Sequence, residues 1–221
     1  MILTKQNLLP TILPFLPTNP VIVEAGTFDG RDTLRMAHFW PDATIHAFEP
    51  VPEIFTMLES NTRQLSNVHR YQLALSDCTG EQSFNISSHP DKPEQPFQAG
   101  TLLTPAERLQ WSKAEYKRAI TVNSITLDEW AIHFGIARVD FLWLDLQGHE
   151  LAVLKTATNV LKHVQVIYTE VNLVSAYHEQ AHWHEMRTWL ERQGFTLLAT
   201  DFDETQPPRW FFGNALFVKK R

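Results

Sequence analysis

Two acidic side chains follow apolar runs that are expected to be buried strands, and they are the first candidates for chemistry. Asp145 comes after the run 139–144, and Glu170 comes after the run 164–168, with Asn172 two positions further on. Ligands of open α/β sheets bind beyond the carboxyl ends of the strands, so these groups could meet there. The two acids could share a hydroxyl group of a substrate, a proton or, together with Asn172, a Mg²⁺ ion. The structural alternative is that Asp145 caps a helix and Glu170 faces solvent.

A turn containing two glycines follows an earlier apolar run, 21–24. Gly26 and Gly30 stand where a strand is expected to pass into a helix, and glycine allows the backbone to approach a ligand closely. Phe28 occupies the place of the second glycine in the dinucleotide-binding fingerprint. The acid-x-Gly-x-x-x-Gly spacing that begins at Glu24 is more similar to the first motif of S-adenosylmethionine (SAM) methyltransferases. The cationic end of SAM favours a nearby carboxylate. An ordinary strand-to-helix turn is the alternative.

Glu49 ends the next predicted strand, 25 positions after Glu24. An acid at the end of a second strand can accept both hydrogen bonds from a ribose diol, as in other nucleotide-binding α/β folds. Glu49 could instead be a solvated carboxylate beside a proline.

The stretch His178-Glu179-Gln180-Ala181-His182 matches the short pattern of zinc proteases. On a helix, its two histidines would face one side and Glu179 would act as the base. However, residues 174–183 lack the pattern of a buried amphipathic helix, and no third ligand follows at the metzincin spacing. Zinc hydrolysis is therefore the weaker hypothesis, and we expect these histidines at the acceptor site or on the surface.

The spacing of apolar residues predicts the elements that would position these groups. Short β-branched runs alternate with longer amphipathic segments, which is typical of a parallel sheet covered by helices. The expected strands are 21–24, 44–48, 68–75, 120–125, 139–144, 164–168 and a final hairpin of 196–200 and 215–218; the expected helices are 34–40 (capped by Asp32 or Thr33), 52–64, 126–134, 150–157 and 182–193. Residues 87–104 contain three prolines and Gly100 without periodicity, which predicts a mobile lid within an insertion at 87–118.

Composition limits the class of protein. The 221 residues include 19 basic and 25 acidic side chains, for a net charge of −6. We expect a single domain over 1–221, with an N-terminal extension at 1–19. The acidic balance disfavours binding to nucleic acid or anionic membranes. With Cys78 as the single cysteine, no intrachain disulfide can form. The absence of a signal-peptide pattern or a long apolar run favours a reducing, cytoplasmic location.

Several motifs occur in the order found in FkbM-type methyltransferases, and the chain resembles that family over residues 20–218. They are Glu24-Ala25-Gly26 with Asp29-Gly30-x-Asp32-Thr33, Ala47-Phe48-Glu49-Pro50, Ala74-Leu75-Ser76-Asp77 with Gly80, Thr126-Leu127-Asp128-Glu129-Trp130, Asp145-Leu146-Gln147-Gly148-His149-Glu150-Leu151, and Tyr168-Thr169-Glu170-Val171. The resemblance implies a Rossmann-like, doubly wound α/β fold of class I, with a mostly parallel seven-stranded sheet and an antiparallel last strand. It also implies O-methylation, with SAM as cofactor, of a hydroxyl on a sugar, polyketide or other small metabolite.

The resemblance further implies where SAM would lie. The glycine turn would contact its methionine end, Glu49 its ribose, and Leu75 with Asp77 its adenine. The expected cofactor-binding residues are Glu24, Gly26, Thr27, Phe28, Gly30, Glu49, Pro50, Leu75, Ser76, Asp77 and Asp145.

The base that removes the acceptor proton is left open among Asp145, His149 and Glu170, although an imidazole titrates closest to neutral pH. The family's frequent Lys-Ile-Asp-Val-Glu-Gly is Trp-Leu-Asp-Leu-Gln-Gly at 143–148 here, so a lysine and an acid are lost. The aromatic residues at 210–212 are expected to wall the acceptor pocket. A SAM- or nucleotide-binding module without catalysis is the main alternative function.

Overall fold

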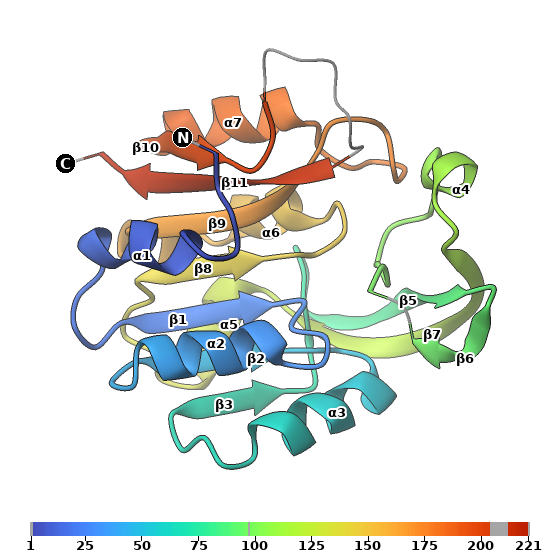
Figure 1. The fold of residues 1–221 in the computed structure, drawn as a ribbon, viewed down its shortest axis with the longest axis horizontal. Helices are drawn as coiled ribbons and strands as arrows, with labels where there is room; N and C mark the ends of the chain where they lie inside the picture. Colours follow the sequence, from blue (N-terminus) through green and yellow to red (C-terminus); the bar gives the residue numbers. More distant parts are fainter. Residues whose placement is uncertain (1, 97, 204–211, 221) are drawn as a thin grey trace.

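A seven-stranded sheet forms the centre of the protein (Figure 1). The computed structural model describes residues 2–96, 98–203 and 212–220. The strand order is β10-β11-β9-β8-β1-β2-β3, and β11 runs antiparallel to both of its neighbours while the other strands are parallel. These strands are β1 (Val21–Ala25), β2 (Thr44–Phe48), β3 (Val68–Tyr71), β8 (Phe141–Leu144), β9 (Val166–Asn172), β10 (Phe195–Thr200) and β11 (Phe212–Lys219). The predicted mostly parallel sheet with an antiparallel last strand is thereby confirmed.

Helices cover both faces of the sheet. One face carries α1 (Leu8–Ile12), η1 (Leu13–Phe15), α2 (Arg31–Phe39) and α3 (Pro52–Thr62); the other carries α5 (Leu127–His133), α6 (Glu150–Thr156), η2 (Val160–Lys162) and α7 (Trp183–Arg192). Successive side chains of a strand point to opposite faces. Accordingly, Ile22 and Phe141 pack under α1 and α2, whereas Val23 and Leu142 pack under α5 and α6. None of the described helices is long and apolar enough to cross a membrane.

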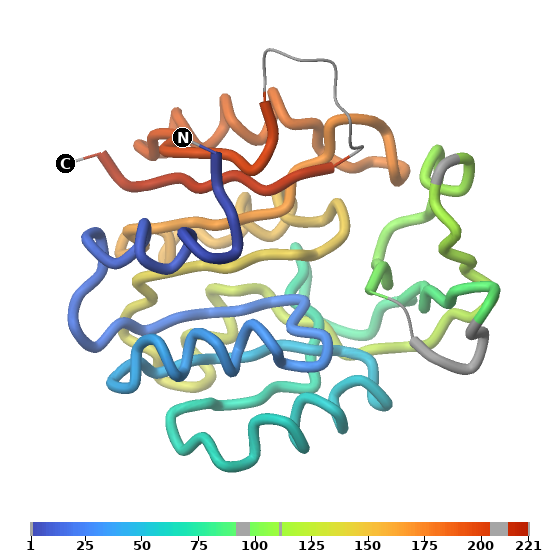
Figure 2. The backbone as a smooth tube through the Cα atoms, viewed as in Figure 1, coloured from blue at the N-terminus to red at the C-terminus, as the bar shows by residue number. Residues whose placement is uncertain are grey.

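A second sheet of four strands stands at the carboxyl ends of the parallel strands (Figure 1). Figure 2 traces the backbone of this part of the chain, in green, beside the main body. Its strands, in the order β4-β7-β5-β6, are β4 (Ala74–Leu75), β7 (Glu115–Ile125), β5 (Gly80–His89) and β6 (Lys92–Pro96), and α4 (Arg108–Trp111) lies between β6 and β7 in sequence. Ala74 pairs with Ser124 and Leu75 with Ile125. The inserted segment therefore leaves and rejoins the body of the protein at neighbouring points.

The prediction of a single strand over 68–75 is wrong, because this segment forms two strands that belong to two different sheets. β3 pairs with β2 as far as the Phe48–Tyr71 pair, and β4 pairs with the end of β7. Similarly, the segment 87–104, predicted to lack structure, contains the end of β5 and all of β6. The prolines that hid β6 from the sequence analysis are tolerated there because β6 is an edge strand.

The start of α2 also differs from the prediction. The helix begins at Arg31, and its N-cap is Gly30, which has a left-handed φ of 80°. Asp32 and Thr33 lie within the first turn and do not cap it. The Thr33 hydroxyl donates instead to a carboxylate oxygen of Glu24 at 2.5 Å, which joins the helix to β1. By contrast, Thr126 caps α5 with its side chain, because its hydroxyl oxygen accepts from the Glu129 backbone amide at 3.2 Å.

Candidate active site

A cavity of about 490 Å³ opens at the carboxyl ends of β1, β2, β8 and β9, against the inserted sheet. Its wall contains most of the residues expected to bind the cofactor and all three candidates for the base. These residues are Glu24, Gly26, Thr27, Phe28, Glu49, Pro50, Leu75, Asp145, His149 and Glu170. Three other expected residues, Gly30, Ser76 and Asp77, are not part of the wall.

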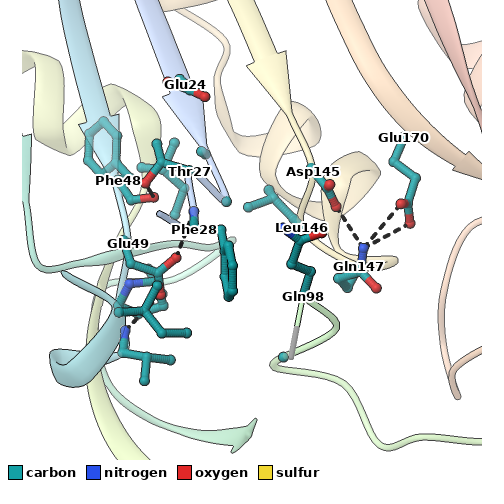
Figure 3. A pocket seen from close by; sticks show the side chains of 18 of the residues that line it. Glu24, Thr27, Phe28, Phe48, Glu49, Gln98, Asp145, Leu146, Gln147 and Glu170 are labelled. Carbon is teal, nitrogen blue, oxygen red and sulfur yellow. Dashed lines mark hydrogen bonds between the residues drawn. The ribbon is translucent and has the colours of Figure 1, made fainter. Parts of the chain in front are cut away.

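The turn after β1 brings the backbones of β1 and β8 into close approach. Gly26 has a left-handed φ of 81°, and a Cβ there would lie 1.9 Å from the carbonyl oxygen of Asp145. Glycine is therefore required at this position by the neighbouring strand. Phe28 is also left-handed, with a φ of 50°, and its ring lies between Glu49 and Leu146 (Figure 3).

Glu49 is buried and held by the backbone on both of its carboxylate oxygens. Oε2 accepts from the Phe28 amide at 3.1 Å, and Oε1 accepts from the Val51 amide at 3.0 Å. Burial raises the pKa of Glu49 to about 8, although these two hydrogen bonds act in the opposite direction. Each oxygen keeps a lone pair for a further donor, so the fixed carboxylate can accept from a diol.

Acidic side chains dominate the cavity wall. The wall contains six acidic side chains and three positively charged ones. The acids are Glu24, Asp29, Asp32, Glu49, Asp145 and Glu170, and the positively charged side chains are Lys5, Arg31 and Arg108. Burial raises the pKa of Glu24 to about 8 as well, while its bond from Thr33 partly offsets the shift. This arrangement favours a cationic ligand, because a positive charge stabilises the ionised form of buried carboxyls.

Asp145 and Glu170 lie together, joined by the side-chain amide of Gln147 (Figure 3). Gln147 Nε2 donates to Asp145 Oδ1 at 2.7 Å and to the two oxygens of Glu170 at 3.3 and 3.1 Å. Burial raises the pKa of Asp145, and burial followed by the charge of Asp145 raises that of Glu170. Their raised pKa values make the two carboxylates stronger proton acceptors than exposed carboxylates, which suits a base that removes a hydroxyl proton.

The residues expected to hold Mg²⁺ do not fit a metal site as they are arranged. Oxygen atoms of Asp145, Glu150 and Glu170 lie within 4.8 Å of one another, and Asn172, the third expected ligand, lies buried at the end of β9. Glu150 accepts from the Leu146 amide at 2.7 Å and from the Gly148 amide at 3.1 and 3.2 Å, so it stabilises the turn before α6. A hard cation needs converging oxygen ligands, whereas an N–H donor of Gln147 lies between two of the carboxylates.

The third candidate base, His149, has its hydrogen-bond partners in another part of the site. Its Nε2 lies 3.2 Å from Ser76 Oγ and 3.4 Å from Asp77 Oδ1, at the end of β4. Burial lowers the pKa of His149, although the neighbouring Asp77 acts to raise it. His149 is thus grouped with the residues expected near the adenine, and Asp145 with Glu170.

The zinc-protease pattern does not form the helix that its chemistry requires. Residues 178–181 form a turn before α7, with Glu179 in a left-handed conformation (φ 62°), and His182 is the N-cap of that helix. His182 Nε2 lies 3.3 Å from Ser175 Oγ. The helix that would hold both histidines of this motif on one face is absent at 178–181, so the motif lacks the geometry of the zinc-protease site.

Sequence reasoning missed two side chains beside the acid pair. The Tyr177 hydroxyl donates to Gln147 Oε1 at 2.8 Å, and burial raises the Tyr177 pKa, so this tyrosine stays protonated. Arg108, which is 5% exposed, lies with its guanidinium carbon 5.4 Å from the centre of the Tyr177 ring. The departure of Gln147 from the family motif was a usable signal, whereas Tyr177 and Arg108 fall in segments without periodicity.

Of the three aromatic residues expected to wall the acceptor pocket, Phe212 does line the cavity. Trp210 and Phe211 lie outside the described residues.

Comparisons with known proteins agree with this geometry. A family model described as "Methyltransferase FkbM domain" matches residues 24–197. The 2-O-methyltransferase NoeI of Sinorhizobium fredii is 28% identical over 165 residues, which cover 73% of this chain and 67% of that protein. The hexuronic acid methyltransferase AglP of Haloferax volcanii is 30% identical over 132 residues, covering 59% of this chain and 48% of that protein. The matches thus span between about half and two thirds of these relatives.

A solved structure shares the fold at low sequence identity. Fibrillarin from Aeropyrum pernix, in complex with S-adenosyl-L-methionine, matches with a TM-score of 0.51 and 15% identity. The match covers 95% of this chain and 74% of fibrillarin.

Proposed function

The chain belongs to the FkbM methyltransferase domain family of SAM-dependent enzymes, and we propose that its acceptor is a hydroxyl of a sugar or other small polar metabolite. The relatives support this acceptor class, because one is named a 2-O-methyltransferase and another a hexuronic acid methyltransferase. The observation that carries the proposal is the pair of acids, half-buried Asp145 and buried Glu170, on the wall of the cavity that Glu49 also lines.

The cofactor would lie across the carboxyl ends of β1 and β2. Glu49 would accept from the two ribose hydroxyls, since backbone amides already fix the orientation of its carboxylate. Phe28, whose ring lies between Glu49 and Leu146, would separate the ribose from the acid pair. The acidic wall would stabilise the cationic end of SAM. Leu75 would contact the adenine, beside the group formed by Ser76, Asp77 and His149.

When bound, SAM supplies a methyl group whose bond to sulfur breaks as its bond to the acceptor oxygen forms. The chain then has two tasks, which are alignment of the hydroxyl and removal of its proton. A carboxylate oxygen of the Asp145–Glu170 pair would accept that proton, since its raised pKa makes the pair a stronger base than an exposed carboxylate. Mg²⁺ has no step in this scheme, because the Gln147 amide lies between the carboxylates.

The inserted sheet would act as a lid over the acceptor. Phe84 and Ile86 of β5, with Gly100 and Leu102, line the same cavity as Glu49 and Asp145, so a bound acceptor would contact the inserted sheet and the loop that follows β6. We propose that residues 87–118 select the acceptor within one domain that spans the chain. The reaction would take place in a reducing cytoplasm, which the single cysteine supports.

Methyl transfer from radiolabelled SAM to hexoses, hexuronic acids and their deoxy analogues would test the proposal. Asp145→Asn is expected to reduce turnover at least ~10²-fold, the low end for a positioned acid or base, while leaving SAM affinity nearly unchanged. Asp42→Asn, which alters an exposed carboxylate outside the cavity wall, is the matched control.

Two outcomes would contradict parts of the proposal. SAM binding without turnover on any acceptor would indicate a binding module. Wild-type turnover in Asp145→Asn would remove Asp145 from catalysis and make His149 the next residue to test.

A further inference from the structure

Gln147 is held in place from three directions. Its amide nitrogen donates to Asp145 and Glu170, its amide oxygen accepts from Tyr177, and its backbone carbonyl accepts from the Thr101 hydroxyl at 3.1 Å. Its φ of 51° is left-handed, a conformation that a residue with a Cβ keeps only where the surroundings enforce it.

The direction of the amide follows from its neighbours. If the amide were reversed, its oxygen would face Asp145 Oδ1 and both oxygens of Glu170 at the distances now spanned by hydrogen bonds, and these oxygens would repel one another. The observed direction gives each carboxylate a donor, and the Tyr177 hydroxyl satisfies the amide oxygen at 2.8 Å.

A divalent ion bound between Asp145 and Glu170 would need the place that this N–H group occupies. The nearby third acid, Glu150, already accepts from the Leu146 and Gly148 amides, which hold its carboxylate at the turn before α6. Replacing the amide NH₂ by an oxygen would turn the same position from a donor into a ligand, with little change in shape.

We propose that Gln147 is a positioning residue that holds Asp145 and Glu170 toward the acceptor hydroxyl in the role a divalent cation would otherwise fill. The effect of Gln147 on catalysis rests on the proposed function, whereas its exclusion of a cation does not. The chemistry is therefore that of a metal-free carboxylate pair, and one substitution, Gln147→Glu, converts the pair into a cation site.

The same residue joins the pair to the inserted segment. From Gln147 the contacts continue through Tyr177 to the Tyr116 hydroxyl at 3.3 Å, and Tyr116 donates to the Ala99 carbonyl at 2.8 Å. The orientation of the acids thus depends on the place of residues 99–116, so an acceptor that orders this segment would also order the pair.

Titration with Mn²⁺, followed by electron paramagnetic resonance and calorimetry, tests the inference without any acceptor. The wild type is expected to bind no stoichiometric Mn²⁺ at this site, and Gln147→Glu to bind one ion per chain. The affinity of Gln147→Glu should exceed that of Gln98→Glu at least ~10-fold, the low end for gain of a ligand-type contact. Gln98→Glu is the matched control, because it adds the same charge to the cavity wall at a residue that does not join the two acids. Adding Asp145→Asn to Gln147→Glu should abolish the binding.

A second variant, Gln147→Met, has similar length but no hydrogen-bonding amide. It is expected to lower kcat ~10- to 100-fold, the effect of misplacing a reacting group, while leaving the KM for SAM unchanged. Tm measurements establish that each variant is folded, and Gln147→Met decides the question if Gln147→Glu does not fold.

Stoichiometric Mn²⁺ binding by the wild type that is lost in Asp145→Asn would overturn the inference, as would equal affinities of the two glutamate variants. So would an unchanged kcat in Gln147→Met. If the Mn²⁺ results are as expected but no hydroxyl acceptor is methylated, the proposed function fails and the role of Gln147 as the group that excludes a cation stands.

Discussion

The affinity for SAM is expected to increase with pH, because Glu49 must ionise to bind the ribose. In the free protein, burial raises the pKa of Glu49 to about 8, so only about a tenth of the molecules carry an ionised Glu49 near pH 7. An ionised carboxylate can accept from both ribose hydroxyls, whereas a protonated one presents a hydrogen atom to one of them. Binding near pH 7 therefore includes the free energy of removing that proton.

The size of the effect follows from the pKa. Ionising a group of pKa about 8 at pH 7 requires about 1.4 kcal/mol, and the requirement nearly vanishes near pH 9. The dissociation constant of SAM should thus fall about tenfold between these values, and binding near pH 7 should release close to one proton. Glu49→Gln should remove this dependence and weaken binding by about 1.5–3 kcal/mol, the contribution of hydrogen bonds to a charged acceptor.

Calorimetric titration in two buffers of different ionisation enthalpy measures both quantities. The amino group of SAM also titrates in this range, but it does so equally with both proteins, so their difference reports on Glu49 alone. Circular dichroism and Tm establish that the variant is folded. Equal proton release by the two proteins, or an affinity of the wild type that does not vary with pH, would refute the reasoning.

Three further measurements test other parts of the structure. Gly26→Ala should lower the free energy of unfolding by at least ~3 kcal/mol, because its Cβ would lie 1.9 Å from the Asp145 carbonyl oxygen. The control is Gly135→Ala, also at positive φ but with no atom within 4 Å of its Cβ, which should lower it by only about 1 kcal/mol. Similar losses in the two variants would contradict the role of the close approach. Burial and the neighbouring His69 lower the pKa of His46 to about 4, so the folded state binds fewer protons than the unfolded state. Urea denaturation should therefore show up to about 3 kcal/mol of stability lost as pH falls from about 6.5 to 4. An unchanged pH dependence in His46→Phe would exclude this cause. Amide exchange at residues 98–104 should be fast in the free protein and slowed by SAM with acceptor, and slow exchange in the free protein would indicate a rigid loop instead of a lid.

The sequence predicted best those elements whose signal is local. The strand at 44–48 begins with the β-branched Thr44 and Ile45 and is ended by Glu49 and Pro50, and it was placed with its observed ends. The break between β3 and β4 was not predictable in this way, because the partner of Ala74 and Leu75 is the end of β7, some fifty residues later. The start of α2 was missed because Gly30 caps it through backbone conformation, without a side-chain hydrogen bond.

In the candidate site, too, some contacts could be predicted from the sequence and others could not. Asp145 and Glu170 were placed together by the rule that parallel strands end at one edge, and their strands are neighbours in the sheet. No comparable rule connects Gln147 to Tyr177, thirty residues apart, because their contact depends on the loop that follows β9. The turn before α6 likewise decides that His149 contacts Ser76, and strand register does not specify such a turn.

The parallel pairing of β4 with the end of β7 has a consequence for how such enzymes diversify. Because Leu75 and Ile125 are paired on neighbouring strands and the Ser76 amide donates to the Ile125 carbonyl, the two ends of the inserted segment are fixed relative to each other whatever lies between them. A segment of another length or sequence can therefore be exchanged at this junction while the strands that carry Glu49 and Asp145 keep their register. In evolution or in protein engineering, exchange of the segment between these two points is therefore a route to new acceptors that leaves the cofactor-binding residues at the ends of β1 and β2 unchanged.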